Sequence, residues 1–116
     1  MLKRMALAAC LIGAWPALLH AHHGWGSYDA KNPITVAGKI LTSQYENPHA
    51  TITVQGADKV WTVTLAPTSR MRNRGALPEL IAVGAEVSAY GYASTVNPDE
   101  MRAERITLGG KTIEMR

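Results

Sequence analysis

Apolar and polar residues alternate along most of the chain after residue 33, which is the pattern of half-buried β-strands. Turn residues interrupt the alternation at short and regular intervals, among them Asn47-Pro48, Asn97-Pro98 and Gly109-Gly110. Five to six short strands are predicted, over residues 34–40, 50–55, 60–65, 86–94, 101–108 and 111–115. Several strands with turn signals at this spacing indicate an all-β fold.

The segment between the third and fourth strands lacks the alternation and predicts a short helical link. Thr68 or Ser69 is expected to cap a helix over residues 70–74, and Gly75 is expected to end it. Three strands, a short helix and further strands follow the order of an OB-like small barrel. A two-sheet sandwich with the same strand order is the structural alternative.

The first 21 residues have the features of a cleaved secretory signal peptide. Lys3 and Arg4 precede an apolar run of about fifteen residues, and Ala21 ends a small-residue cleavage site. The run is shorter than the ~20 residues that span a bilayer as a helix, so no membrane span is expected after cleavage. The predicted organisation is a signal peptide over 1–21, an N-terminal arm over 22–33 and an OB-like domain over 34–116, in a periplasmic protein.

Cleavage after Ala21 would also change the charge of the chain. The whole sequence has 12 Lys and Arg against 9 Asp and Glu, a formal net charge of +3, and Lys3 and Arg4 leave with the leader. The mature charge of +1 gives no reason to expect a nucleic-acid partner. Arg70, Arg72 and Arg74 would form a basic patch on the helical link, but they predict a solvated helix face in an exported protein.

Several short motifs give the chain a family resemblance. They are Ala21-His22-His23-Gly24-Trp25, Tyr28-Asp29, the strand Thr35-Val36-Ala37-Gly38-Lys39-Ile40, Asn47-Pro48-His49, and Gly91-Tyr92. The chain resembles an uncharacterised family of short exported bacterial proteins whose mature start reads His-His-Ser-Phe or similar. Gly24-Trp25 replaces Ser-Phe here, which marks a divergent branch. The resemblance implies a periplasmic location and a small β domain, and it implies no settled activity.

Three histidines, His22, His23 and His49, are the candidate metal ligands. Cleavage after Ala21 would give His22 a free α-amine beside its imidazole, and such nitrogen donors suit Cu(II), while imidazole also serves zinc or nickel. The strand over 50–55 buries its even-numbered residues, so His49 should lie on the outward face.

The arm provides the reach for such a site. Twelve residues extended at ~3.3 Å each would be long enough to bring His22 beside His49. His23, or a carboxylate such as Glu46 or Asp29, would complete the site. The alternative interpretation is that the paired histidines form a solvated tail, since chain termini are often disordered.

Two classes of function follow from these features. The first is a periplasmic barrel that binds copper or another transition metal as a carrier or sensor. The second is an interaction module without metal, whose outer barrel face and aromatic arm dock a periplasmic or membrane-associated protein. No catalytic residue is predicted, because the serines lack a nucleophile-elbow context and Asp99 and Glu100 are adjacent in a turn, where solvation of a loop is expected.

Overall fold

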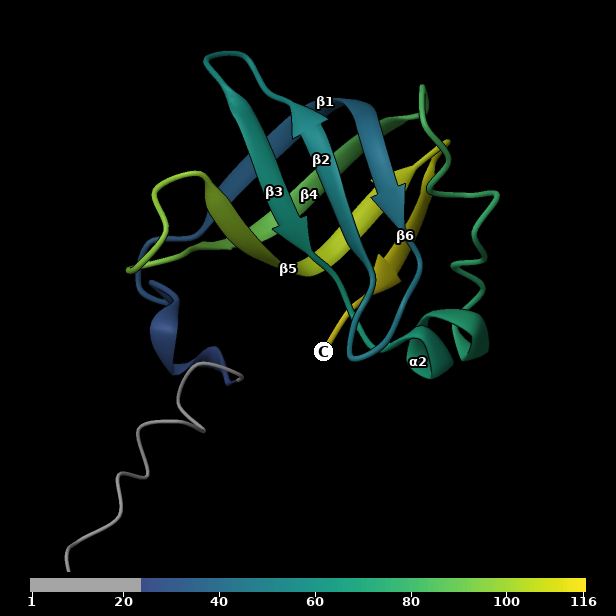
Figure 1. The fold of residues 1–116 in the computed structure, drawn as a ribbon, viewed down its shortest axis with the longest axis horizontal. Helices are drawn as coiled ribbons and strands as arrows, with labels where there is room; N and C mark the ends of the chain where they lie inside the picture. Colours follow the sequence, from purple (N-terminus) through teal and green to yellow (C-terminus); the bar gives the residue numbers. More distant parts are fainter. Residues whose placement is uncertain (1–23) are drawn as a thin grey trace, which may run out of the picture.

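The computed structural model describes residues 24–116. In this part of the chain six strands, one α-helix and one 3₁₀ turn follow each other along the sequence (Figure 1). Their bounds are η1 (Trp25–Ser27), β1 (Ile34–Gln44), β2 (Thr51–Gln55), β3 (Val60–Thr64), α2 (Thr68–Asn73), β4 (Glu86–Ala93), β5 (Glu100–Leu108) and β6 (Lys111–Glu114). The all-β prediction with one short helical link is confirmed.

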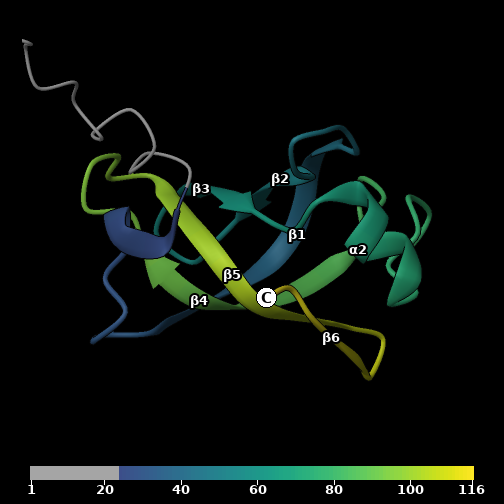
Figure 2. The ribbon, with the colours of Figure 1, turned by 90° about the horizontal axis from the view of Figure 1, so that it is seen from below.

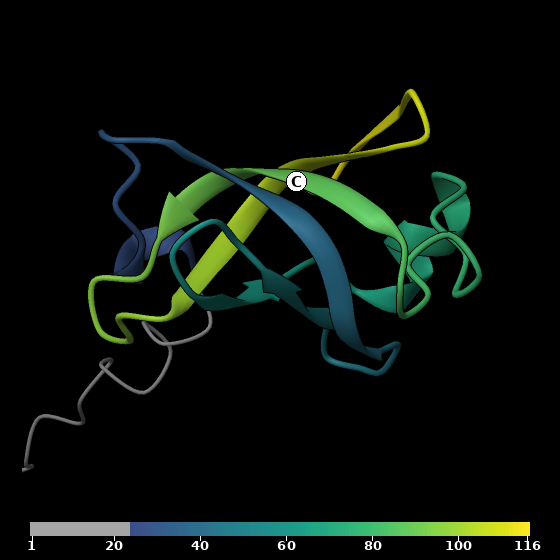
Figure 3. The same cartoon turned by 90° about the horizontal axis from the view of Figure 1, so that it is seen from above.

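The strands close into a barrel. Their order in the sheet is β3-β2-β1-β4-β5-β6. A further parallel pairing of β3 with β5, with Val63 opposite Met101, closes the first five strands of this order into a ring. All other neighbouring strands are antiparallel. Five strands therefore form a small closed barrel rather than a sandwich. β6 is an additional strand paired to β5, and the turn between them projects from the barrel (Figures 2 and 3).

The barrel interior is filled by the inward residues of the alternating strands. On β2, Ile52 and Val54 are fully buried while Thr51 and Thr53 face outward. Met71 of α2 joins the same core. Burial of each such side chain stabilises the fold by about 1.5–3 kcal/mol. The remaining core side chains are apolar as well: Val36, Ile40, Ala50, Val63, Leu65, Ala66, Ala76, Ile81, Val87, Ala89, Met101, Ala103, Ile106, Leu108, Ile113 and Met115.

Strand β1 is longer than the alternation indicates. The sequence predicts its end at Ile40, whereas the strand continues to Gln44. The pairing with β2 shifts register between Ile40 and Thr42, so Leu41 forms an irregularity that breaks the simple period of two. A bulge of this kind bends the strand. It also interrupts the alternation of apolar and polar residues, so the alternation does not predict the second half of the strand.

Two glycines allow neighbouring strands to approach closely. A Cβ atom at Gly38 of β1 would collide with the carbonyl oxygen of Gln55, and one at Gly91 of β4 would collide with that of Arg102. Gly91 lies where the pairing of β4 with β5 shifts register. At both positions the backbone of the neighbouring strand is too close for a Cβ atom, so only glycine fits there.

The start of α2 differs from the prediction. Pro67 precedes the helix, and no side chain caps it. Instead of capping, the Thr68 hydroxyl donates a hydrogen bond of 2.8 Å to Oδ1 of Asn47, which ties the helix to the loop between β1 and β2. Gly75, with φ of +84°, follows the helix as expected. No helix within residues 24–116 is long and apolar enough to cross a membrane.

Candidate functional site

The outward residues of three strands meet on one face of the barrel. On β5, Glu100 and Arg102 face outward because their neighbour Met101 points into the core. Thr64 of β3 lies opposite Arg102, and Thr51 of β2 lies opposite Thr64. We call the outer surface of β2, β3 and β5 at this end of the barrel the arm face, because the N-terminal arm packs on it.

The arm is anchored to the end of β4. Tyr28 forms an isolated antiparallel bridge with Ser94, and the amide of Asp29 donates a hydrogen bond of 2.9 Å to the carbonyl of Ala93. The amide of Thr95 donates one of 2.8 Å to the carbonyl of Ser27. From residue 24 onward the arm is therefore part of the folded domain, whereas the sequence suggested an extended connection.

Tyr28 reaches the arm face through Glu100. Its hydroxyl donates a hydrogen bond of 2.7 Å to Oε1 of Glu100. The same oxygen accepts a bond of 3.3 Å from the Thr64 hydroxyl, and Oε2 accepts one of 2.7 Å from Nδ2 of Asn97. Because Tyr28 covers it, Thr64 is only 5% exposed although it faces outward. We call Tyr28, Thr64, Asn97 and Glu100 the Glu100 cluster.

The hydrogen bonds fix the protonation of this cluster. Burial alone would raise the pKa of Glu100, but the hydrogen bonds from Tyr28, Asn97 and Thr64 and the nearby charge of His49 lower it below its usual value. Burial, together with the hydrogen bond to Glu100 and its negative charge, raises the pKa of Tyr28 to about 12. At neutral pH the cluster therefore holds an ionised carboxylate and a neutral phenol.

His49 has a nitrogen atom without a hydrogen-bond partner. It precedes Thr51 by two residues, and its Nδ1 is shielded from solvent and has no partner within residues 24–116. A buried polar atom without a partner costs about 1–3 kcal/mol, so it is expected to be satisfied by an ordered water, an ion or a ligand. The alternation predicted that His49 lies on an outward face; in the structure its side chain is partly buried just before β2.

The structure gives no support for a metal-binding role of the other predicted ligands. His22 and His23 lie outside the described residues. Glu46 is exposed, and both carboxylate oxygens of Asp29 accept hydrogen bonds from Nδ2 of Asn32, at 3.3 and 3.1 Å. Within residues 24–116 no group of three or more His, Cys, Asp or Glu side chains could hold a metal ion. The described part of the arm face thus offers two donor groups, His49 and Glu100.

Sequence reasoning missed Glu100, which it assigned to a solvated loop together with Asp99. Glu100 is the first residue of β5 and has three hydrogen-bond donors around its carboxylate. The available signal was the outward alternation of charged residues on this strand, at positions 100, 102 and 104. Tyr28 and Thr64 could not be assigned to the site without knowing that they are its neighbours.

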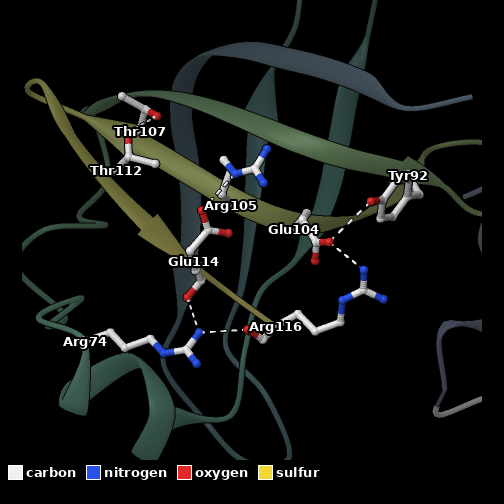
Figure 4. A network of polar contacts seen from close by, with 8 residues as sticks. All are labelled: Arg74, Tyr92, Glu104, Arg105, Thr107, Thr112, Glu114 and Arg116. Carbon is white, nitrogen blue, oxygen red and sulfur yellow. Dashed lines mark hydrogen bonds and ion pairs between the residues drawn. The ribbon is translucent and has the colours of Figure 1, made fainter.

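Aromatic and arginine side chains extend the arm face beyond the Glu100 cluster. The guanidinium groups of Arg102 and Arg116 lie 4.2 and 4.7 Å from the ring centre of Trp25. Tyr92 contacts Trp25 edge to face, at 5.9 Å between ring centres. Glu104 accepts hydrogen bonds of 2.6 Å from Nη2 of Arg116 and 3.4 Å from the Tyr92 hydroxyl (Figure 4). These contacts hold the arm by cation–π and ionic interactions.

The arginines of the helical link also have partners within the chain. Nη1 of Arg74 donates to the carbonyl oxygens of Glu114 and Arg116, at 2.7 and 3.0 Å (Figure 4). Arg70 donates to the carbonyl of Met115 at 2.9 Å, and Arg72 stacks on Tyr45. The expected solvated helix face is therefore wrong in part, because Arg70 and Arg74 attach the C-terminal residues to α2, and Arg72 contacts the loop between β1 and β2.

A separate pocket of about 460 Å³ lies between the start of β1 and the turn joining β2 to β3. It shares no residue with the Glu100 cluster, and Asp58 is its one charged lining residue. Its walls are mainly apolar, from Ile34, Val36, Ala37, Ala57, Trp61 and Ala93. His49 is not among its lining residues.

Comparison with known proteins gives a family and a fold. The model of a family described as "Family of unknown function (DUF6152)" matches residues 10–99. No curated protein matches the chain. Similar solved structures include a ZRD-deleted mutant of TiaS in complex with agmatine, with a TM-score of 0.53 and 18% identity over 75% of this chain. Another is a complex of TiaS with a tRNA and ATP, with a TM-score of 0.51 and 19% identity over 69% of this chain.

These structures belong to much longer proteins. The chain spans 27% of the first and 18% of the second. At such low identity the likeness concerns the barrel fold, and it carries no statement about ligand or activity.

Proposed function

The chain belongs to DUF6152, a family of unknown function, and we propose from its arm face that it binds a transition metal. In this proposal it is a periplasmic protein that binds copper, or another transition metal, through His22, His23 and His49 as a carrier or sensor. The observation that carries the proposal is the shielded Nδ1 of His49, which has no hydrogen-bond partner among the described residues. Imidazole nitrogen is a common ligand of copper, zinc and nickel.

The anchored arm supports the proposal through chain connectivity. Tyr28 is bonded to Glu100, and the ring of Trp25 lies against Arg102, so the arm is anchored on the barrel from this point onward. His22 and His23 directly precede this anchored segment in the sequence, so we expect a mature N-terminus at His22 to start close to the arm face.

The chemistry depends on where the mature chain begins. Cleavage after Ala21 would add the α-amine of His22, with a reference pKa of about 7.7–8.0, to the imidazoles of His22 and His23. The amine and the imidazoles must be unprotonated to bind a metal, so affinity is expected to rise with pH. A carrier or sensor fits better than an enzyme, because the apolar pocket beside β1 shares no residue with the Glu100 cluster.

The interaction-module alternative has less support. The aromatic side chains that would form a docking surface are engaged within the chain, since Trp25 contacts Arg102, Arg116 and Tyr92. The tRNA bound in one of the similar structures gives no reason to propose a nucleic-acid partner. Arg70 and Arg74 already hold backbone carbonyl oxygens of this chain.

Copper titration of correctly processed protein tests the proposal. Mass spectrometry of the exported protein should first show a mature chain that starts at His22. Cu(II) affinity, measured by competition with a chelator, is then compared with an N-terminally acetylated form, which lacks the free α-amine, and with His49→Ala. Each change should weaken binding about tenfold or more, since each removes a ligand. Thr53→Ala is the matched control on the same strand face. Equal affinity of all four proteins would exclude the proposed site.

A further inference from the structure

Strand β1 has an unpaired edge in its first half. The strand bends along its length, and it pairs with β4 over residues 34–39 and with β2 over residues 39–44 (Figure 1). β2 ends at Gln55, opposite Lys39, and the turn over residues 56–59 follows. Residues 34–38 therefore have a described strand on one side only. We call the opposite side of residues 34–38 the β1 edge.

The backbone hydrogen bonds show which residues face this edge. The amide of Ile40 donates a hydrogen bond of 2.9 Å to the carbonyl of Ala85, which directly precedes β4, so Ile40 faces β4. Successive residues of a strand direct their N–H and C=O groups to opposite sides, so Thr35 and Ala37 face the β1 edge. In the described part of the chain no backbone hydrogen bond joins either residue to a turn or loop. Such unpaired groups are a template for a further strand.

The pocket of about 460 Å³ runs along the same edge. It is lined by residues 34–37 of β1, by residues 56–58 of the turn after β2, by Trp61 and by Ala93. Val36 points into the barrel, whereas Thr35 and Ala37 are exposed on the other face of the strand. Because residues of both faces line it, the pocket lies beside the strand. Its volume is within the range of ligand-binding pockets, about 300–1,000 Å³.

We propose that the β1 edge and this pocket bind an extended peptide segment of another protein, which adds a strand beside β1. Main-chain hydrogen bonds to Thr35 and Ala37 hold the segment. Side chains alternate along a strand, so every second side chain of the segment points to the side of Val36 and Trp61 and enters the pocket. This binding site is independent of the proposed metal site.

The charge of the pocket favours a segment that carries a basic residue. Asp58 is its one charged lining residue, and its carboxylate has no ion pair or hydrogen bond among the described residues. The neighbouring Lys59 is already engaged by Asp99 at 3.3 Å and by the carbonyl of Pro98 at 2.6 Å. A Lys or Arg beside Asp58 adds little affinity at an exposed position, but it sets the orientation of the segment.

A second copy of this chain fits the site less well than a free segment. Two β1 edges have the backbone groups to pair with each other. The apolar side chains of that strand, Ile34 and Val36, are however packed in the core of their own barrel. The pocket would then stay unfilled, whereas a free extended segment supplies both the backbone groups and the apolar side chain.

Hydrogen exchange of assigned amides tests the edge in the free protein. The amides of Thr35 and Ala37 should exchange faster than those of Val36 and Gly38, which face β4. Equal protection of these four amides would overturn the proposal.

A displayed library of random linear heptapeptides is the probe for binding, with a chelator present so that no metal takes part. Selected peptides should alternate apolar residues with others and carry a Lys or Arg. In the complex the amides of Thr35 and Ala37 should become protected from exchange. N-methylation of the peptide amides that face β1 should weaken binding about tenfold, and N-methylation of those between them much less. Failure to select any peptide, or an equal loss in both N-methylated sets, would overturn the proposal.

Variants of the protein test the same contacts from the other side. Ala37→Pro removes an N–H of the β1 edge without breaking a bond to β4, so it should weaken binding of the selected peptide about tenfold, while Ala37→Val keeps the N–H and is the matched control. Asp58→Asn should weaken it about two- to fivefold, and Glu46→Gln should not. Thermal unfolding identifies a variant that fails to fold, in which case the N-methylated peptides decide. Equal affinity of Ala37→Pro and Ala37→Val, or a dimer of the wild type that Ala37→Pro abolishes, would contradict the assignment to a peptide of another protein.

Discussion

The interior of the barrel and the arm face are built by different means. Inside, Ile52 and Val54 come from a local alternation and are fully buried among apolar side chains. On the arm face, Tyr28 and Glu100 are 72 residues apart in sequence and are joined by one hydrogen bond. An apolar side chain needs only a space of suitable size, whereas a polar one needs a particular partner. The interior is therefore encoded locally, and the arm face is defined only by the fold.

The two regions also differ in what they contribute. The apolar interior provides most of the stability, since hydrophobic burial is the dominant favourable term in folding. A hydrogen bond adds about 0.5–1.5 kcal/mol on balance, so the arm face contributes less to stability. What it provides is the ordered arrangement of Tyr28, Thr64 and Asn97 around the carboxylate of Glu100. Substitutions in the two regions should therefore separate stability from metal binding.

The largest effect on stability is expected from a substitution in the barrel interior, compared with a substitution at the neighbouring exposed position. Ile40 is fully buried and its neighbour Leu41 is 40% exposed. Ile40→Ala should lower the free energy of unfolding by about 2–5 kcal/mol, because it removes buried methyl groups and leaves a cavity. Leu41→Ala should change it by less than about 0.5 kcal/mol. Urea unfolding of both variants measures the difference, and similar losses in the two would contradict the assigned alternation of β1.

A smaller loss is expected where two strands approach closely. A Cβ atom at Gly91 would collide with the carbonyl oxygen of Arg102, whereas one at Gly26 of η1 meets nothing within 4 Å. Gly91→Ala should cost about 1–3 kcal/mol of stability, since the backbone of β5 must move. Gly26→Ala should be close to neutral in the same thermal or urea unfolding experiment. If Gly91→Ala also left the stability unchanged, β4 and β5 would not approach each other as closely as described.

The smallest effect concerns the arm face and depends on pH. Tyr28→Phe removes the bond to Glu100 and should cost ~1 kcal/mol at neutral pH, since the bond is charge-assisted but partly exposed. The pKa of Glu100 is lower in the folded protein than the usual value of 4.5. Its ionised form therefore stabilises the fold above pH 4.5, and this contribution is lost as the pH falls through the lowered pKa. The pKa of Tyr28 is raised from 10.0 to about 12 in the folded protein. Its neutral phenol therefore contributes to stability below pH 10, and this contribution is lost as the pH rises through 12.

Melting temperatures from about pH 3 to pH 11 measure this dependence. The wild type should exceed Tyr28→Phe most between about pH 5 and pH 10, and the difference should narrow at both ends. A constant difference across this range would show that the phenol and the carboxylate do not interact.

The sequence predicted the interior far better than the arm face. Alternation located all six strands and the helical link, because buried positions repeat with the period of the strand. It missed the second half of β1, where the irregularity at Leu41 breaks the period, and the start of α2, where Thr68 bonds to Asn47 instead of capping.

The sequence identified His49 as a candidate ligand, with Glu46 and Asp29 as candidate carboxylates, but it did not identify the hydrogen-bonded Glu100. Glu100 looked like part of a solvated turn because its neighbours Asp99 and Pro98 are turn residues. Its donors, Tyr28 and Thr64, come from the arm and from β3, and only the closed barrel brings them to β5. No local pattern encodes such a contact.

The central claim is that the mature N-terminus and the arm face form one metal site. The most direct measurement is the broadening of assigned amide resonances by substoichiometric Cu(II) in the protein that starts at His22, since a paramagnetic ion broadens the signals of nearby nuclei. The account predicts that broadening affects the first residues of the arm together with those around His49, Thr64 and Glu100. Broadening confined to the first residues of the chain, with the signals of β3 and β5 unchanged, would contradict it.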